Sequence, residues 1–228
     1  MKKGLTGNQL KLIALAAMTV DHVGMILFPS QLLFRVIGRL AFPVFAYMIA
    51  EGCLHTRSMG RYIGMLAIVA AVCQGAYFFA MGSLYQCIMV TFCLSVCLWW
   101  LVRRAMEKRN VFSWAMAAVG ILAVFFITEI LPVILAGTDF SVDYGFLGVI
   151  LPVAICCGRT KGEKLCAAAA ILFAMGWQLG ILQWCSLFSL PLLALYNGQR
   201  GKRKLKYFFY IYYPAHLVII YFASFLIF

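Results

Sequence analysis

Long apolar stretches separated by short polar loops dominate the chain. A transmembrane helix needs roughly 20 mostly apolar residues, and nine stretches approach or reach this length. They cover residues 10–29, 33–54, 62–81, 84–102, 112–136, 144–157, 165–180, 183–196 and 207–228. The pattern therefore predicts an all-α polytopic membrane protein of about nine transmembrane helices, formed by one domain over residues 1–228.

Composition and charge agree with this prediction and orient the chain. Of the 228 residues, 65% are hydrophobic and 11% are charged, whereas soluble domains carry about 25% charged residues. The net charge of +12 is concentrated in alternate loops, which contain Lys2, Lys3 and Lys11, Arg57 and Arg61, Arg103 to Arg109, Arg159 to Lys164, and Arg200 to Lys206. Basic loops face the cytoplasm, so we expect a cytoplasmic N-terminus, lipid contacts and no nucleic-acid partner.

Three ionisable residues lie near the middle of apolar stretches. Asp21 and His22 belong to the first stretch and His216 to the last. Such groups are costly at membrane depth and mark functional sites, although a hydrogen-bonded histidine that packs two helices is an alternative for His22. Adjacent residues point in different directions around a helix, so Asp21 is expected to pair with a basic group of a neighbouring helix, Arg35 or Arg39.

The second stretch contains two arginines that the loop pattern does not explain. Arg35 and Arg39 are four residues apart and share a helix face. They suit a multivalent anion, because each guanidinium offers a fork of donors. Structural ion pairs with Asp21, Glu51 or Glu129 would explain the two arginines equally well. A third alternative is that the Arg35 side chain extends to the outer membrane surface.

Backbone interruptions accompany these polar residues. Gly38 and Pro43 are expected to loosen the second stretch around Arg39. Pro214 is expected to kink the last stretch, which would place Tyr212 and His216 along the wall of a cavity.

Further polar residues lie in the loops. Glu51 ends the second stretch, and Arg57 and Arg61 repeat the spacing of four; they are either ordinary cytoplasmic cations or a phosphate-binding cluster. The Asn-Gly pair predicts a tight turn at Tyr196–Gly201, where Arg200 suits an anion. On the outer side, Asp139 and Asp143 either hold a cationic substrate or favour the start of the next helix.

Several motifs together resemble the TraX family over nearly the entire chain. They are Leu10-Lys11 through Met18-Thr-Val-Asp-His22, Arg35-x-x-x-Arg39-x-Ala-Phe-Pro-x-Phe, Glu51-Gly52, Asp143-Tyr-Gly145, Tyr196-Asn-Gly-x-Arg-Gly201 and Lys206-Tyr-Phe-Phe-Tyr-x-Tyr-Tyr-Pro-x-His216. This resemblance implies a membrane acetyltransferase similar to a wider group of transmembrane acyltransferases, with pilin amino termini as the substrates for which the family is named.

The resemblance also implies roles for individual residues. His22 would be the catalytic base, with Asp21 and His216 beside it. Lys11, ten intervening residues before His22, would contact cytosolic acetyl-CoA together with Arg57, Arg61 and Arg200. A further group would bind the acceptor or stabilise the negative charge that develops on the thioester oxygen; it consists of Arg35, Arg39, Glu51 and Tyr212.

The sequence leaves several alternatives open. The acceptor is an amine or a hydroxyl, on a peptide N-terminus or a cell-envelope glycan, and transfer is direct or passes through an acetyl-enzyme. No Cys/His spacing suits zinc, so no metal is expected. The rival function is a proton-coupled secondary transporter, since intramembrane Asp, His and Arg residues also form proton relays; a scaffold protein ranks last. The expected location is a bacterial-type cytoplasmic membrane.

Overall fold

The computed structural model describes residues 4–202 and 205–227, and every regular element within these ranges is a helix. Lys2, Lys3, Arg203 and Lys204 of the predicted basic loops lie outside them. The chain divides into two compact units, which we describe separately. The first contains Met1–Met48 and Thr160–Phe228, and the second contains Ile49–Arg159.

Among the described residues, five helical segments are long and apolar enough to cross a membrane: Gly7–Leu27, Leu32–His55, Met59–Phe79, Ile88–Lys108 and Val111–Ile134. Three shorter apolar helices are Gly145–Cys157, Ile181–Ala194 and Ile211–Ser224. The predicted all-helical membrane class is confirmed. The count of nine spans and the cytoplasmic N-terminus stay predictions.

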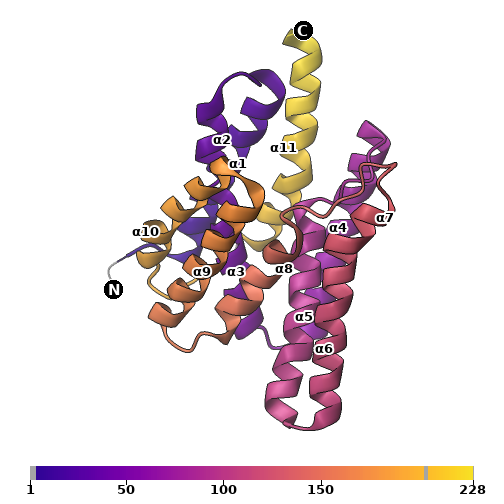
Figure 1. The fold of residues 1–228 in the computed structure, drawn as a ribbon. Helices are drawn as coiled ribbons and strands as arrows, with labels where there is room; N and C mark the ends of the chain where they lie inside the picture. Colours follow the sequence, from indigo (N-terminus) through magenta and orange to yellow (C-terminus); the bar gives the residue numbers. More distant parts are fainter. Residues whose placement is uncertain (1–3, 203–204, 228) are drawn as a thin grey trace. The chain divides into compact units, whose positions relative to one another are not determined.

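The first unit consists of α1 (Gly7–Leu27), α2 (Leu32–Gly38), the first half of α3 (Ala41–His55), α9 (Lys161–Leu179), the 3₁₀-helix η2 (Ile181–Phe188), α10 (Ser189–Ala194) and α11 (Lys206–Ile227). These elements carry the indigo, orange and yellow parts of the ribbon in Figure 1.

Helices α1 and α2 form a tight antiparallel hairpin. The turn between them contains Pro29, and a residue before proline is disfavoured in a helix. Two glycines allow close packing, because a Cβ on Gly24 would overlap Phe34 and one on Gly38 would overlap Asp21. The chain then breaks between Gly38 and Ala41, as the sequence predicts. Pro43 lies in the first turn of α3, where its missing N–H costs nothing.

Helix α11 packs alongside α1 in the same direction. Lys11 Nζ lies 5.5 Å from the centroid of the Phe209 ring, and His22 contacts His216 further along both helices. Both helices therefore begin at the same end of the unit.

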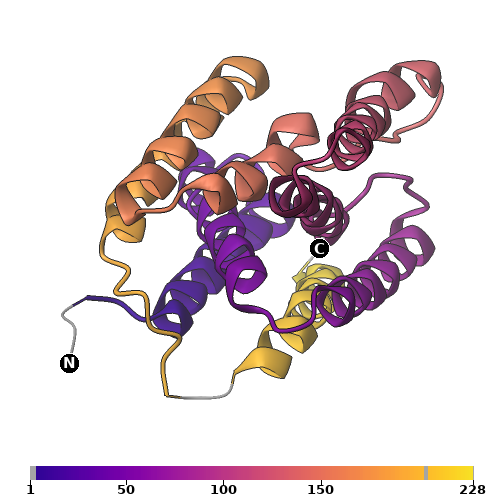
Figure 2. The ribbon, with the colours of Figure 1, turned by 90° about the horizontal axis from the view of Figure 1, so that it is seen from below.

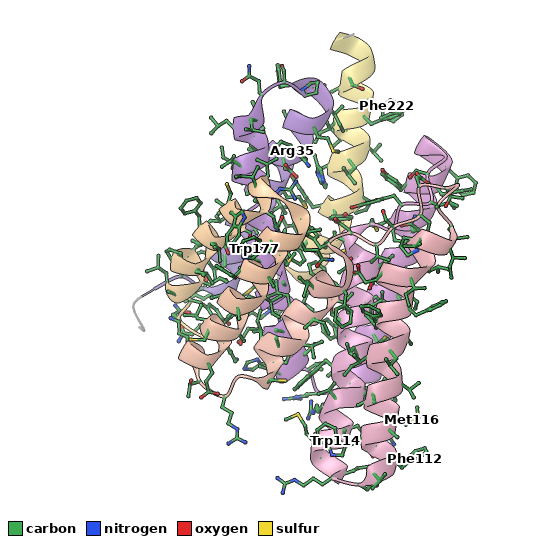
Figure 3. The ribbon with its side chains drawn as sticks, viewed as in Figure 1. Arg35, Phe112, Trp114, Met116, Trp177 and Phe222 are labelled. Carbon is green, nitrogen blue, oxygen red and sulfur yellow. The ribbon has the colours of Figure 1, made fainter. Side chains whose placement is uncertain are left out.

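The second unit contains the rest of α3, α4 (Met59–Met81), α5 (Ile88–Lys108), α6 (Val111–Phe125), the π-helix η1 (Phe126–Ile130), α7 (Leu131–Ile134) and α8 (Gly145–Cys157). Helices α5 and α6 lie side by side, joined by a short turn (Figures 1 and 2). Phe112, Trp114 and Met116 project outward from α6 (Figure 3), with Phe112 74% exposed. This apolar exposure suits contact with lipid.

The loops of the second unit are fastened by acidic side chains. Asp139 accepts hydrogen bonds from the Ser83 hydroxyl and from Leu84 N, the latter at 2.8 Å. Asp143 Oδ1 accepts one from the Tyr85 hydroxyl at 2.7 Å. These bonds connect the loop after α4 with the loop before α8.

Glu129 provides the hydrogen bond at the start of α8. It lies in η1, where the regular helical ladder is interrupted next to Pro132, which has no N–H to donate. Glu129 Oε1 accepts a hydrogen bond from Phe146 N at 2.7 Å. Glu129 thus satisfies a helix-start amide, and this contact lies within the second unit.

Candidate functional site

Two histidines far apart in the sequence are hydrogen-bonded within the first unit. His22 Nδ1 on α1 and His216 Nε2 on α11 lie 2.8 Å apart. His216 Nδ1 lies 2.9 Å from the Tyr212 carbonyl oxygen, one turn earlier on the same helix. His216 is only 4% exposed. The structure therefore brings together the two histidines that the sequence predicts as site residues.

These contacts determine where the protons lie. A carbonyl oxygen only accepts, so His216 Nδ1 carries the hydrogen that it donates to Tyr212. In a neutral imidazole the other nitrogen is then an acceptor, and His22 Nδ1 must donate to His216 Nε2. Neutral His22 consequently has its lone pair on Nε2. The chain of bonds leaves His22 Nε2 as the basic nitrogen of the pair.

Tyr212 contacts the histidine pair from one turn earlier on α11. Its ring stacks on His216 with centroids 5.2 Å apart and an interplanar angle of 9°. Its hydroxyl lies 2.9 Å from Thr19 Oγ1, which itself donates to the Leu15 carbonyl oxygen at 2.9 Å. Since the single hydroxyl proton of Thr19 is used there, the Tyr212 hydroxyl donates to Thr19. The predicted donation by Tyr212 to a developing negative charge would require this bond to break.

Asp21 pairs with Arg35, one of the two partners expected from the sequence. Arg35 Nη1 lies 2.9 Å from Asp21 Oδ1, and the two side chains are 28% and 17% exposed. Arg35 is labelled on α2 in Figure 3. Because Gly38 has no side chain, α2 approaches α1 closely enough for this pair to form. The ion pair thus belongs to the hairpin that also carries His22.

Arg39 has a partner that the sequence analysis did not identify. Its Nη1 donates to Gln183 Oε1 at 3.3 Å. Gln183 lies on η2 and is 2% exposed. A single glutamine in an apolar stretch does not by itself indicate a functional site. The regular spacing of Gln183, Ser186 and Ser189, three residues apart, does indicate a polar helix face. All three polar side chains are buried.

The predicted coenzyme contacts Lys11 and Arg200 lie in the first unit, at the end where α1 and α11 begin. The turn around Gly198 and Gly201 is confirmed by their positive φ values of 76° and 98°. Its carbonyls bond the start of α1, because Gly7 N donates to Gln199 O and Asn8 N to Arg200 O. These helix-start amides are therefore not available to an anion, and the exposed Arg200 side chain is the group that remains suited to one.

Lys161 supplies a further cation at this end. Its Nζ donates to the carbonyl oxygens of Ala194 and Tyr196, the latter at 2.8 Å. This contact holds the start of α9 against the turn that precedes α11. The first unit therefore gathers basic side chains at one end.

The remaining predicted site residues, Glu51, Arg57 and Arg61, belong to the second unit. Glu51 is buried, and His55 Nδ1 lies 2.9 Å from its carbonyl oxygen and 3.8 Å from its carboxylate. Arg57 and Arg61 are exposed, but they do not share a helix, because α4 begins at Met59 after the capping residue Ser58. Their spacing of four residues therefore does not place them on one helix face. Their role in a site with His22 stays a prediction.

The fold and these polar pairs define an all-helical membrane protein with ionisable side chains within its apolar helices. The chain belongs to the TraX family, whose model, described as TraX protein, matches residues 6–224. This confirms the family that the sequence motifs resemble.

Two curated relatives match shorter parts of the chain. A probable fimbrial assembly protein FimC, serogroup H1, of Dichelobacter nodosus is 34% identical over 80 residues, which cover 30% of each protein. An uncharacterized protein of Rickettsia prowazekii (strain Madrid E) is 50% identical over 38 residues, or 17% of this chain and 15% of the relative. The chain thus spans less than a third of either relative. No solved structure matches it.

Proposed function

We propose that the protein is a membrane-embedded acetyltransferase of a bacterial-type cytoplasmic membrane, which moves an acetyl group from cytosolic acetyl-CoA to an amine or hydroxyl acceptor. His22 is the base. The observation that carries the proposal is the hydrogen-bond chain from the Tyr212 carbonyl through His216 to His22.

In this proposal His22 Nε2 takes the proton of the acceptor as its nitrogen or oxygen bonds to the thioester carbonyl carbon. The carbon–sulfur bond then breaks, and the leaving thiolate takes the proton back from His22 Nε2. His216 acts through His22: it fixes the ring orientation and keeps the proton on Nδ1. This division of labour is the one by which a third group orients the base in catalytic triads.

The charge distribution supports a cytosolic donor. Acetyl-CoA carries several phosphates, and Lys11 and Arg200 lie where α1 and α11 begin. His22 is eleven residues beyond Lys11, about 16 Å along the helix. The parallel course of α1 and α11 is consistent with an odd number of crossings from first to last helix. The proposed nine spans meet this condition, and the basic loops favour a cytoplasmic N-terminus.

The acceptor is proposed to be a peptide N-terminus or a cell-envelope glycan. The resemblance to the TraX family implies pilin amino termini as substrates, and one relative is named as a probable fimbrial assembly protein. Both favour a peptide amine of an exported protein.

The test is thioester turnover by the full-length protein purified in detergent or nanodiscs. Acetyl-CoA should be hydrolysed or its acetyl group transferred, and His22→Ala should lower the rate by about 10²- to 10⁴-fold. His55→Gln is the matched control, since His55 is the exposed histidine of α3 and should retain the rate. Equal rates in wild type and His22→Ala would refute the proposal.

A proton-coupled transporter is the second candidate, and the same histidine pair favours it, because hydrogen-bonded chains at membrane depth conduct protons. Reconstituted vesicles separate the two functions. A transporter would carry protons in response to a solute gradient and show no thioester turnover.

A further inference from the structure

A buried polar stripe runs along the 3₁₀-helix η2 and into the first residue of α10. Gln183, Ser186 and Ser189 follow one another at intervals of three residues and are 2%, 0% and 0% exposed. A 3₁₀-helix has three residues per turn, so side chains three apart lie directly above one another. Such helices seldom exceed four residues, whereas η2 extends over eight. The 3₁₀ geometry aligns Gln183 with Ser186, and Ser189, the first residue of α10, continues the stripe.

Hydrogen bonding fixes the orientation of the Gln183 amide. Arg39 can only donate, so the atom facing its Nη1 is the amide oxygen of Gln183. The amide nitrogen therefore points elsewhere. Among the described residues, Gln183 Nε2 has no hydrogen-bond partner, and the same holds for Ser186 Oγ. Ser189 differs, because its hydroxyl donates to the Ser186 carbonyl oxygen at 2.6 Å.

Buried polar groups are almost always hydrogen-bonded, and leaving one unpaired is costly. Two unpaired groups one turn apart on one helix face are therefore a feature that needs an explanation. Both can donate, and the neighbouring Arg39 adds a positive charge. A ligand that satisfies them must present an accepting, preferably negatively polarised oxygen.

The stripe lies close to the histidine-bearing hairpin. Arg39 directly follows Gly38, whose backbone packs against Asp21, and Asp21 directly precedes His22. All of these residues belong to the first unit.

We propose that Arg39, Gln183 and Ser186 form a buried site that binds a carbonyl or carboxylate group of a substrate. Gln183 Nε2 and the Ser186 hydroxyl donate to its oxygen, and the Arg39 guanidinium supplies the charge. The assignment of the bound group rests on the proposed acetyl transfer. In that reaction the group belongs to the acceptor or to the thioester.

The binding test uses small probes and the full-length protein in nanodiscs. Acetate and acetamide are followed by saturation-transfer NMR, with methylammonium as a cation of similar size. Wild type should bind acetate and acetamide but not methylammonium, and Ser186→Ala and Gln183→Met should each weaken acetate binding at least tenfold. Ser189→Ala is the matched control, since its hydroxyl already has a partner, and it should bind like wild type.

A second readout separates a binding site from a structural one. Without probe, Ser186→Ala should melt at the same temperature as wild type or higher, because an unpaired buried hydroxyl is removed. Ser189→Ala should melt lower, because it loses a formed hydrogen bond. Unchanged acetate binding in both Ser186→Ala and Gln183→Met, or preferential binding of methylammonium, would overturn the proposed site.

Acceptor-free hydrolysis of acetyl-CoA distinguishes the two sources of the bound group. A hydrolysis rate unchanged in Ser186→Ala assigns the group to the acceptor, and a reduced rate assigns it to the thioester. The probes bind without any transfer. A protein that binds acetate as described but turns over no thioester therefore refutes the acetyltransferase proposal and leaves the site in place.

Discussion

The backbone of Gly38 packs directly against the side chain of Asp21. A Cβ at position 38 would overlap both the Cβ and the carboxylate of Asp21. The same carboxylate pairs with Arg35, three residues before Gly38 on α2. The contact therefore sets the spacing between α1 and α2 at the level of the histidine pair.

This contact makes Gly38→Ala destabilising. The added methyl group must displace Asp21 or separate the two helices, and overpacking of this kind costs about 1–3 kcal/mol. The melting temperature of the purified protein in detergent should therefore fall. Gly64→Ala is the control, because nothing lies within 4 Å of a Cβ there and alanine favours helix over glycine. Equal melting temperatures for the two variants would contradict this packing.

The Asp21–Arg35 pair should behave as a coupled unit. Removing one partner of a fully buried pair costs about 3–5 kcal/mol, because the other charge stays buried. With side chains 28% and 17% exposed, we expect roughly 2 kcal/mol for Arg35→Gln or Asp21→Asn alone. The double variant should be more stable than the sum of the two losses predicts. A double-mutant cycle of unfolding free energies measures this coupling, and strictly additive losses would show that the pair contributes none.

Hydropathy and charge predict the helical class because they act over many residues. Each of the nine apolar stretches corresponds to helical structure among the described residues, although the ends shift by several positions. The break near Arg39 is also readable, since Gly38 and Pro43 act locally on the backbone. The cost of an unpaired charge at membrane depth predicts that Asp21 pairs with Arg35 or Arg39, and the structure selects Arg35.

Other features depend on contacts that the sequence does not encode locally. The hydrogen bond between His22 and His216 requires that α1 and α11 run in parallel at one particular register. The role of Gln183 depends on η2 being a 3₁₀-helix, whereas a spacing of three residues also fits an α-helix. Arg57 and Arg61 are four residues apart but do not share a helix, because the capping residue Ser58 lies between them and α4 begins only at Met59.

Acid should loosen the loop contact of Asp139. The hydrogen bond from the Ser83 hydroxyl, and then that from the Leu84 amide, hold the pKa of Asp139 below its usual value. A lowered carboxyl pKa stabilises the folded state above the unfolded pKa of about 3.9, and this contribution is lost as the pH falls through the folded pKa. Ser83→Ala removes the larger cause, so the pKa of Asp139 should rise towards its usual value.

Carboxyl NMR titration of labelled aspartate measures this change. Thr138→Ala, which alters the neighbouring residue, is the control and should leave the Asp139 pKa where it is in wild type. If the pKa of Asp139 is the same in Ser83→Ala as in wild type, the Ser83 hydrogen bond does not lower that pKa.

The protonation pattern of the histidine pair can be tested without any substrate. In wild type at neutral pH, His22 and His216 should both carry their proton on Nδ1, because the Tyr212 carbonyl orders the chain of donors. Nitrogen-15 NMR of labelled histidine distinguishes the two ring tautomers, and single His→Gln variants assign the signals. In His22→Gln, His216 should keep its proton on Nδ1, since Tyr212 still accepts it. In His216→Leu, which has no acceptor atom, His22 loses the acceptor for its Nδ1 proton and should show the Nε2-protonated form. A wild-type His22 protonated on Nε2 would place two lone pairs face to face across 2.8 Å, and would rule out its assignment as the base.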